Sequence, residues 1–136
     1  MNYLGLDLGT KTVGIAISTS GIIASGLETY RFKEHAYELA VHYIKKLISQ
    51  HDIQVVVIGL PKHMNNDLGD RAQHTFWFKE QLADSKIQVD LFDERLSTKT
   101  AMSGLSMQNA SIDKKKALKD TLSAVVILQN YLNTKR

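Results

Sequence analysis

The chain contains no cysteine and a single proline among its 136 residues. Without cysteine it can form no disulfide, no thiolate zinc site and no cysteine nucleophile. Long apolar runs are also missing: the longest uncharged stretch, residues 12–27, is too short and too rich in Ser, Thr and Gly to span a membrane. No basic region precedes the N-terminal apolar residues, so we expect no secretory signal and a cytoplasmic location.

The rest of the composition is that of an ordinary globular protein, with 43% hydrophobic and 23% charged residues. A chain of this length has room for one hydrophobic core, and we expect a single domain over residues 1–136. The formal net charge is +3 and the isoelectric point is near 9.1. This mild basic excess permits nucleic-acid binding but does not require it.

The N-terminal third reads as three strands joined by tight turns. Apolar segments at residues 2–8, 12–19 and about 22–32 are separated by Gly9 and by the pair Ser20-Gly21. Glycine suits tight turns between antiparallel strands, so this pattern predicts an antiparallel meander.

Helices and strands then alternate. The apolar period becomes helical over residues 34–50, with a predicted buried stripe of Ala36, Ala40, Tyr43, Ile44 and Leu47. The remaining predicted elements are a doubly buried strand at 53–59, a helix at 70–83 capped by Asp70, a strand at 87–92, a short helix near Ser97 and a helix from Asp113 to Leu132. This order predicts an α/β fold with a five-stranded mixed sheet, three antiparallel strands followed by two parallel ones, flanked by helices.

Asp7 is the first residue that suggests chemistry. It ends an apolar strand-like run and opens the turn before the next one. A carboxylate on a central strand costs several kcal/mol unless it is paired, hydrogen-bonded or bound to a metal.

Two more acidic residues can approach Asp7. Glu94 follows the predicted strand 87–92, at the strand end where α/β sheets usually bind ligands, although Asp93, Glu94 and Arg95 would also suit a solvated turn. Asp120 shares a helix face with a mostly apolar set, and an ion pair with Lys116 or a position at the edge of that face is the alternative explanation for it. The residues of that face are Ala117, Asp120, Ala124, Ile127 and Tyr131.

If the fourth strand lies between the first and the last, Asp7, Glu94 and Asp120 can converge on one site. Three close carboxylates repel one another unless a cation neutralises them. Oxygen ligands without cysteine favour Mg²⁺ or Mn²⁺, and such a site can hold two ions for phosphodiester hydrolysis.

Four sequence blocks resemble the YqgF/RuvX family of Holliday-junction-resolvase-like proteins. The blocks are Gly5-Leu6-Asp7-Leu8-Gly9-Thr10-Lys11-Thr12-Val13-Gly14-Ile15-Ala16, then Gly59-Leu60-Pro61 with Gly69-Asp70-Arg71-Ala72, then Asp93-Glu94-Arg95-Leu96-Ser97-Thr98, then Lys119-Asp120 leading into Ala124-Val125-Val126-Ile127-Leu128. Their order and spacing over nearly the whole chain make the resemblance strongly specific. Four positions depart from the usual pattern and affect loop geometry and substrate fit: His63, Asn65, Asn66 and Ser97.

The resemblance implies an RNase H-like fold and a metal-dependent nuclease with Asp7, Glu94 and Asp120 at the family's acidic positions. Maturation of the 5′ end of precursor 16S ribosomal RNA is the activity it favours. Resolution of branched DNA and a non-catalytic nucleic-acid-binding role are the alternatives. An actin-like ATPase has a similar first turn but needs a second domain for which this chain has no room.

A nuclease also needs cations that hold phosphates. Lys11, Lys62, Arg71 and Arg95 fall in segments that can surround the acidic cluster, where they would bind the nucleic-acid backbone without reading bases. A solubilising surface is the alternative for each of them. The sequence leaves open whether the protein acts as a monomer or as a homodimer.

Overall fold

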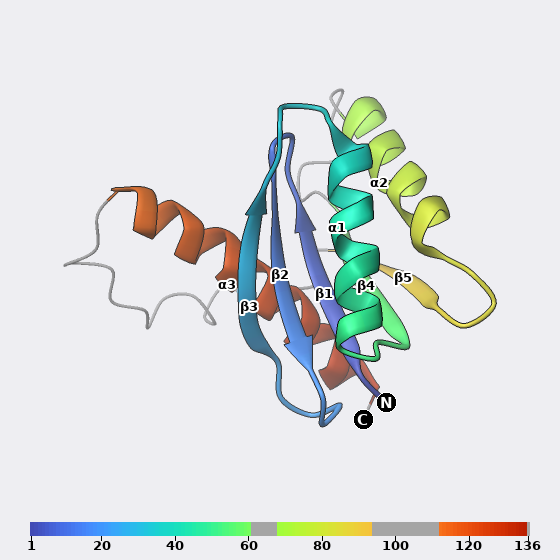
Figure 1. Cartoon of the computed structure of the whole chain (residues 1–136). Coiled ribbons are helices and arrows are strands. Elements are labelled where there is room, and N and C mark those ends of the chain that lie inside the picture. The colour runs from blue at the N-terminus through green and yellow to red at the C-terminus, as the bar shows by residue number, and fades with distance from the viewer. Residues whose placement is uncertain (61–67, 94–111, 136) are drawn as a thin grey trace.

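The computed structural model describes residues 1–60, 68–93 and 112–135, and only the backbone for 68–72, 93 and 112–120. Within these ranges the elements are β1 (Tyr3–Leu8), β2 (Thr12–Ser18), β3 (Ser25–Arg31), α1 (Tyr37–Gln50), β4 (Val55–Leu60), α2 (Leu68–Leu82), β5 (Gln88–Asp93) and α3 (Ile112–Thr134) (Figure 1).

The five strands form one mixed sheet in the order β3-β2-β1-β4-β5. β1 pairs antiparallel with β2 and β2 antiparallel with β3, whereas β4 runs parallel to both β1 and β5. The predicted sheet is therefore confirmed, and β4 does lie between β1 and β5. As a result the C-terminal ends of β1, β4 and β5 meet at one edge of the sheet.

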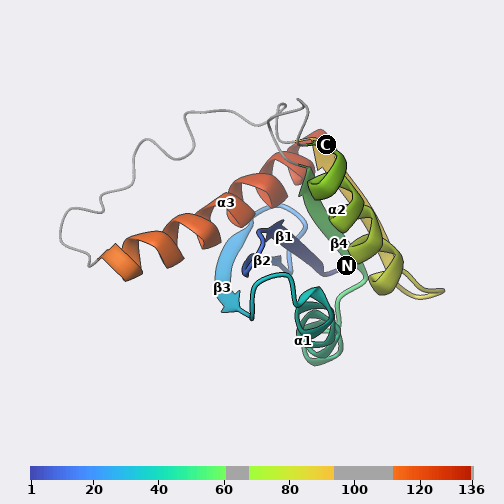
Figure 2. The ribbon, with the colours of Figure 1, turned by 90° about the horizontal axis from the view of Figure 1, so that it is seen from above.

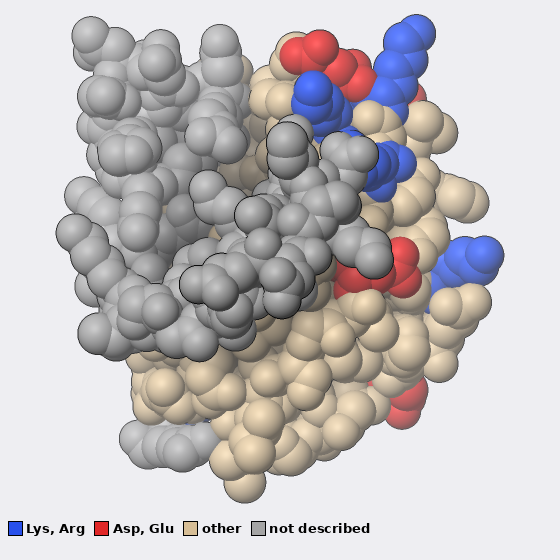
Figure 3. All heavy atoms as spheres, turned by 90° about the vertical axis from the view of Figure 1, so that its left-hand side faces the viewer, with Lys and Arg blue, Asp and Glu red and all other residues tan. Residues whose placement is uncertain are grey.

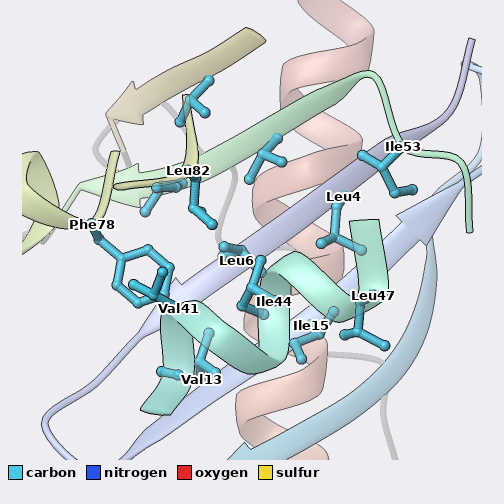
Figure 4. Close-up of a cluster of buried hydrophobic side chains, with 14 residues drawn as sticks. Leu4, Leu6, Val13, Ile15, Val41, Ile44, Leu47, Ile53, Phe78 and Leu82 are labelled. Atoms are coloured by element: carbon cyan, nitrogen blue, oxygen red, sulfur yellow. The ribbon is translucent and has the colours of Figure 1, made fainter. Parts of the chain in front are cut away.

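Helices cover both faces of the sheet, with α3 on one side and α1 on the other, as Figure 2 shows from above. The face toward α1 and α2 holds the larger apolar cluster, in which alternate residues of β1 and β2 meet the two helices. Its best-buried members include Leu4, Leu6, Val13, Ile15, Ile44 and Phe78 (Figure 4). Strand β4 is buried from Val55 to Gly59, as expected for a central parallel strand.

Helix α3 lies unusually close to the opposite face, because that face carries small residues. A Cβ on Gly26 of β3 would lie 2.6 Å from Thr121 Cγ2 of the helix. At its other end the helix is tied down by hydrogen bonds: Gln129 accepts a bond from Ala24 N at 2.8 Å, and the Tyr131 hydroxyl donates to Asp90 of β5. The helix thus crosses the sheet from β3 to β5.

Several predicted boundaries were wrong by a few residues. β3 begins at Ser25 rather than near residue 22, and Ile22 and Ile23 are exposed. α1 begins at Tyr37 rather than 34, because His35 has a left-handed backbone with φ 64° that no helix continues.

Two predicted helix caps were also wrong. Because α2 begins at Leu68 and α3 at Ile112, Asp70 and Asp113 lie inside their helices. Asp93 belongs to β5 instead of following it. The short helix expected near Ser97 falls outside the described residues.

The start of β1 and the end of α3 both lie at the lower end of the molecule in Figure 1, opposite the C-terminal edge of β1. The start of β1 is fixed there, since Asn2 Nδ2 donates to the carbonyls of His51 and Asp52 at 3.0 and 3.1 Å. None of the helices in the described part of the chain combines the length and apolar character that a membrane crossing requires.

Candidate active site

Asp7 lies at the C-terminal end of β1, on the sheet face that α3 covers. Gly5 faces α3, because a Cβ on it would meet Leu128, and side chains two residues apart on a strand share a face. Asp7 is half-buried. Its partner on β2 is Gly14, which has no side chain to crowd the carboxylate.

The same row continues onto β3. Gly14 pairs with Thr29, which lies two strand spacings or about 9.6 Å from Asp7. A hydrogen bond of 2.7 Å joins the Thr29 and Thr121 hydroxyls and fixes α3 above this row. Asp7, Gly14 and Thr29 thus form a floor with a small-residue centre beneath the helix.

Helix α3 brings the position of the third predicted acid to this floor. Position 120 immediately precedes Thr121 and lies one helical turn before Ala124, whose carbonyl oxygen would be 3.1 Å from a Cβ on Gly5. Ala124, Ile127 and Tyr131 are buried, which confirms that this helix face packs on the sheet. The Asp120 side chain is outside the described residues, although its backbone belongs to α3.

The second predicted acid follows β5 at the same edge of the sheet. Leu60 of β4 pairs with Asp93 of β5, and Leu6 of β1 pairs with Ile58 of β4. The last residues of the three parallel strands are therefore neighbours, and β5 lies two strand spacings, about 9.6 Å, from β1. Glu94 comes directly after Asp93 and lies outside the described residues.

Another acid on this face, Asp90, has a structural role. Asp90 of β5 pairs with Val57 and accepts hydrogen bonds from the Tyr131 hydroxyl and from Gln88 Nε2. Burial, together with this bond to Asp90, raises the pKa of Tyr131 far above its usual value. Asp90 therefore anchors α3 and is separate from the Asp7 edge.

Of the three predicted metal ligands, only Asp7 has a described side chain. Among the side chains that the structure describes, no group of three or more His, Asp or Glu residues that could hold a metal is found. The chemistry of Asp7 nevertheless fits a hard cation, because a half-buried carboxylate supplies the oxygen ligands that Mg²⁺ and Mn²⁺ prefer.

One of the four predicted phosphate-binding residues is placed in full. Lys11 is exposed in the turn between β1 and β2, close to Asp7. Arg71 belongs to α2, but only its backbone is described, and Lys62 and Arg95 lie outside the described residues. Sequence reasoning missed Arg31 and Lys33, which strand pairing brings beside Lys11, since only the β2–β3 register reveals this neighbourhood.

The fold and the chain's relatives define its class. The architecture is that of RNase H-like resolvases: RuvC of Thermus thermophilus in complex with a Holliday junction substrate aligns with a TM-score of 0.65 and 10% identity, covering 99% of this chain and 95% of that one. The Fowlpox virus resolvase in complex with Holliday junction DNA aligns with a TM-score of 0.60 and 12% identity, covering 99% of both chains.

The sequence places the chain within a particular family. The model of the RuvX family, described as Holliday junction resolvase, matches residues 1–134, and the chain belongs to this family. A protein of Aster yellows witches'-broom phytoplasma is 46% identical over 132 residues, which cover 96% of this chain and 87% of the relative. A Staphylococcus aureus protein is 44% identical over 134 residues, 96% and 94% of the two chains. Both carry the name "Putative pre-16S rRNA nuclease". Family membership rules out the ATPase alternative.

Proposed function

We propose that this protein is a divalent-metal-dependent endonuclease that hydrolyses phosphodiester bonds in precursor 16S ribosomal RNA. The relatives that bear this name match nearly the whole chain at 44–46% identity. The observation that carries the proposal is the position of Asp7: a half-buried carboxylate at the sheet edge where parallel strands end, beside Gly14 and under α3.

The proposed metal ligands are Asp7, Glu94 and Asp120. Position 120 on α3 and the end of β5 both lie near the Asp7 edge, which supports a shared site for these residues. When bound, two Mg²⁺ or Mn²⁺ ions supply an activated water and stabilise the charge on the leaving 3′ oxygen. Asp7 would fix the position of the cations from the sheet, while Glu94, which follows β5 in the sequence, and Asp120 of α3 would supply further carboxylate ligands.

The proposed role of the basic residues is to hold the substrate. Lys11, Lys62, Arg71 and Arg95 would bind phosphates and set the register of the strand over the acidic site, without selecting bases. Lys11 supports this role, because it is exposed in the turn that follows Asp7.

Resolution of branched DNA is the second candidate. It is favoured by the likeness to two resolvases whose structures contain Holliday junctions. Symmetric cleavage of a four-way junction requires two active sites, so this candidate demands a homodimer, whereas cleavage of ribosomal RNA can proceed on a monomer.

The test incubates the wild type, Asp7→Asn and Asp90→Asn with precursor ribosomal RNA and with a synthetic four-way junction, in Mn²⁺ and in chelator. We expect Mn²⁺-dependent cleavage of the RNA at one position by the wild type and by Asp90→Asn, and none by Asp7→Asn. Asp90→Asn is the matched control because it removes a carboxylate from the same sheet face. Cleavage by Asp7→Asn at the wild-type rate would refute the site, and cleavage of the junction alone would select the second candidate.

A further inference from the structure

Three exposed cations from two separate stretches of the chain meet beside the Asp7 edge. Thr12 of β2 pairs with Arg31 of β3, and the Phe32 N–H donates to the Lys11 carbonyl at 3.0 Å. Lys11, Arg31 and Lys33 are all exposed. We call Lys11, Arg31, Lys33 and His35 the hairpin-end surface, because they lie where β2 and β3 meet the β1–β2 turn.

Arg31 is on the same face of the sheet as Asp7. It follows Thr29 by two residues, and Thr29 is bonded to Thr121 of α3 on that face. The Cα atoms of Arg31 and Asp7 are about 12 Å apart, because Arg31 lies two strand spacings across the sheet and two residues further along it. A long arginine side chain from this position can reach a phosphate next to one that is bound at Asp7.

His35 continues the surface over the end of the sheet. Its N–H donates to the Thr10 carbonyl at 2.8 Å, and its backbone has φ 64°, in the left-handed region where His, Asn and Asp occur more often than other non-glycine residues. The His35 side chain is exposed, with its ring centre 6.1 Å from that of Tyr37 and 6.2 Å from that of His74. The His35 imidazole therefore lies beside two other rings and remains accessible to a ligand.

The balance of charge on this surface is positive. Glu34 is the one acid in the same stretch, so the three cations leave a net charge of two. Figure 3, viewed from the β3 side, shows basic atoms gathered in the upper half of this face, with acidic atoms among them. A local excess of cations beside an exposed ring, here that of His35, is a combination that binds single-stranded nucleic acid.

We propose that the hairpin-end surface holds the phosphodiester backbone of the substrate strand beside Asp7, with Arg31 and Lys33 binding phosphates and the His35 ring stacking on an unpaired base. The proposal rests on the proposed function and names residues that position the substrate. None of the three side chains takes part in the chemical step.

The test measures binding without cleavage. The full chain is titrated, in chelator, against an unstructured single-stranded RNA and against a four-way DNA junction over a series of salt concentrations. The double variant Arg31→Gln/Lys33→Gln is compared with Lys46→Gln/Lys86→Gln, which removes the same charge from exposed positions on α1 and in the α2–β5 turn. Removing one cation that binds a phosphate of a single strand reduces the slope of log K against log salt by about 0.7.

We expect the slope for RNA to fall by about 1.4 in the first double variant, equivalent to about 25-fold weaker binding at 0.1 M salt if the curves converge at 1 M. The control should keep the wild-type slope. The same change in slope with the four-way junction would also support the proposed binding surface, and would show that it binds the backbone of branched DNA. Equal slopes for both double variants and the wild type on both ligands, or no wild-type binding to either, would overturn the proposal.

His35 is tested by His35→Asn. Asparagine tolerates the left-handed backbone but has no ring, so the loop should keep its shape. We expect about tenfold weaker RNA binding with an unchanged salt slope, because a stacking ring is lost while Arg31 and Lys33 are kept. Asp52→Asn, at the other described non-glycine residue with positive φ, is the control. Wild-type affinity in His35→Asn would show that the His35 ring does not contribute to RNA binding.

Cleavage is measured separately from binding. A protein that binds RNA through this surface but never cleaves it would contradict the proposed function and leave the proposed binding surface standing.

Discussion

Gly5 of β1 and Leu128 of α3 are in such close contact that a Cβ at position 5 would lie 2.7 Å from the Leu128 Cβ. The absence of a side chain at Gly5 therefore sets the height of α3 above the sheet. The same helix carries position 120, so the distance between the helix and Asp7 depends on this contact.

Gly5→Ala should lower the free energy of unfolding by about 1–3 kcal/mol, because a rigid backbone oxygen and a Cβ block the added methyl group. Urea denaturation followed by circular dichroism measures the change. Gly26→Ala is the comparison: its methyl group would meet only the Thr121 side chain at close range, so its cost should be smaller. Equal costs at the two positions would show that α3 can shift without penalty.

The Thr29–Thr121 hydrogen bond should couple the two residues energetically. Thr29→Val should cost about 1 kcal/mol, because it leaves the Thr121 hydroxyl without this partner, whereas Thr29→Val/Thr121→Val should cost less than the sum of the single changes. A double-mutant cycle from denaturation curves measures the coupling. Strict additivity would mean that the bond does not hold the helix in place.

Tyr43 should make stability depend on pH in the alkaline range. The hydrogen bond from its hydroxyl to the Glu28 carboxylate, aided by burial, raises the pKa of Tyr43 to about 12. Because the folded pKa exceeds the unfolded value of 10.0, the contribution is fully present below pH 10 and is lost as the pH rises through about 12.

The thermal midpoints of wild type and Tyr43→Phe, measured between pH 8 and 12.5, should differ most below pH 10 and converge above 12. Glu28→Gln weakens the same bond from the other side and should reproduce the pattern. A gap that stays constant with pH would contradict the assignment.

Divalent ions should stabilise the fold through Asp7. A ligand that binds only the native state at 100 times its dissociation constant adds about 2.7 kcal/mol, which corresponds to a rise of several degrees in the melting temperature. We expect this rise when Mn²⁺ is added to the wild type and to Asp90→Asn, and its absence in Asp7→Asn. Chelator should abolish cleavage while the circular dichroism spectrum of the fold persists. An equal rise in all three proteins would place the ions elsewhere.

The sheet could be predicted from the sequence because its signals are local. Gly9 and Ser20-Gly21 separate the first three strands, and the unbroken apolar run ending at Gly59 predicts a buried parallel strand. The helix boundaries were less accurate. The left-handed backbone of His35 is accompanied by a hydrogen bond to the Thr10 carbonyl, and no pattern in residues 30–37 predicts that contact.

The candidate site was predictable only in part, for a similar reason. Asp7 stands out because a charge interrupts an apolar strand. Arg31 does not, because an arginine at the end of an edge strand is ordinary until its pairing with Thr12 places it near Asp7. The positions of Glu94 and Asp120 follow from strand and helical periodicity, and their joint role as ligands stays a prediction.

The position of the two chain ends has a practical consequence. Since both lie at the end of the molecule away from Asp7, a tag or a surface attachment at either one leaves the Asp7 edge open to a long polynucleotide. The protein can therefore be immobilised by either end for single-molecule measurements, and a fusion partner there would not block access.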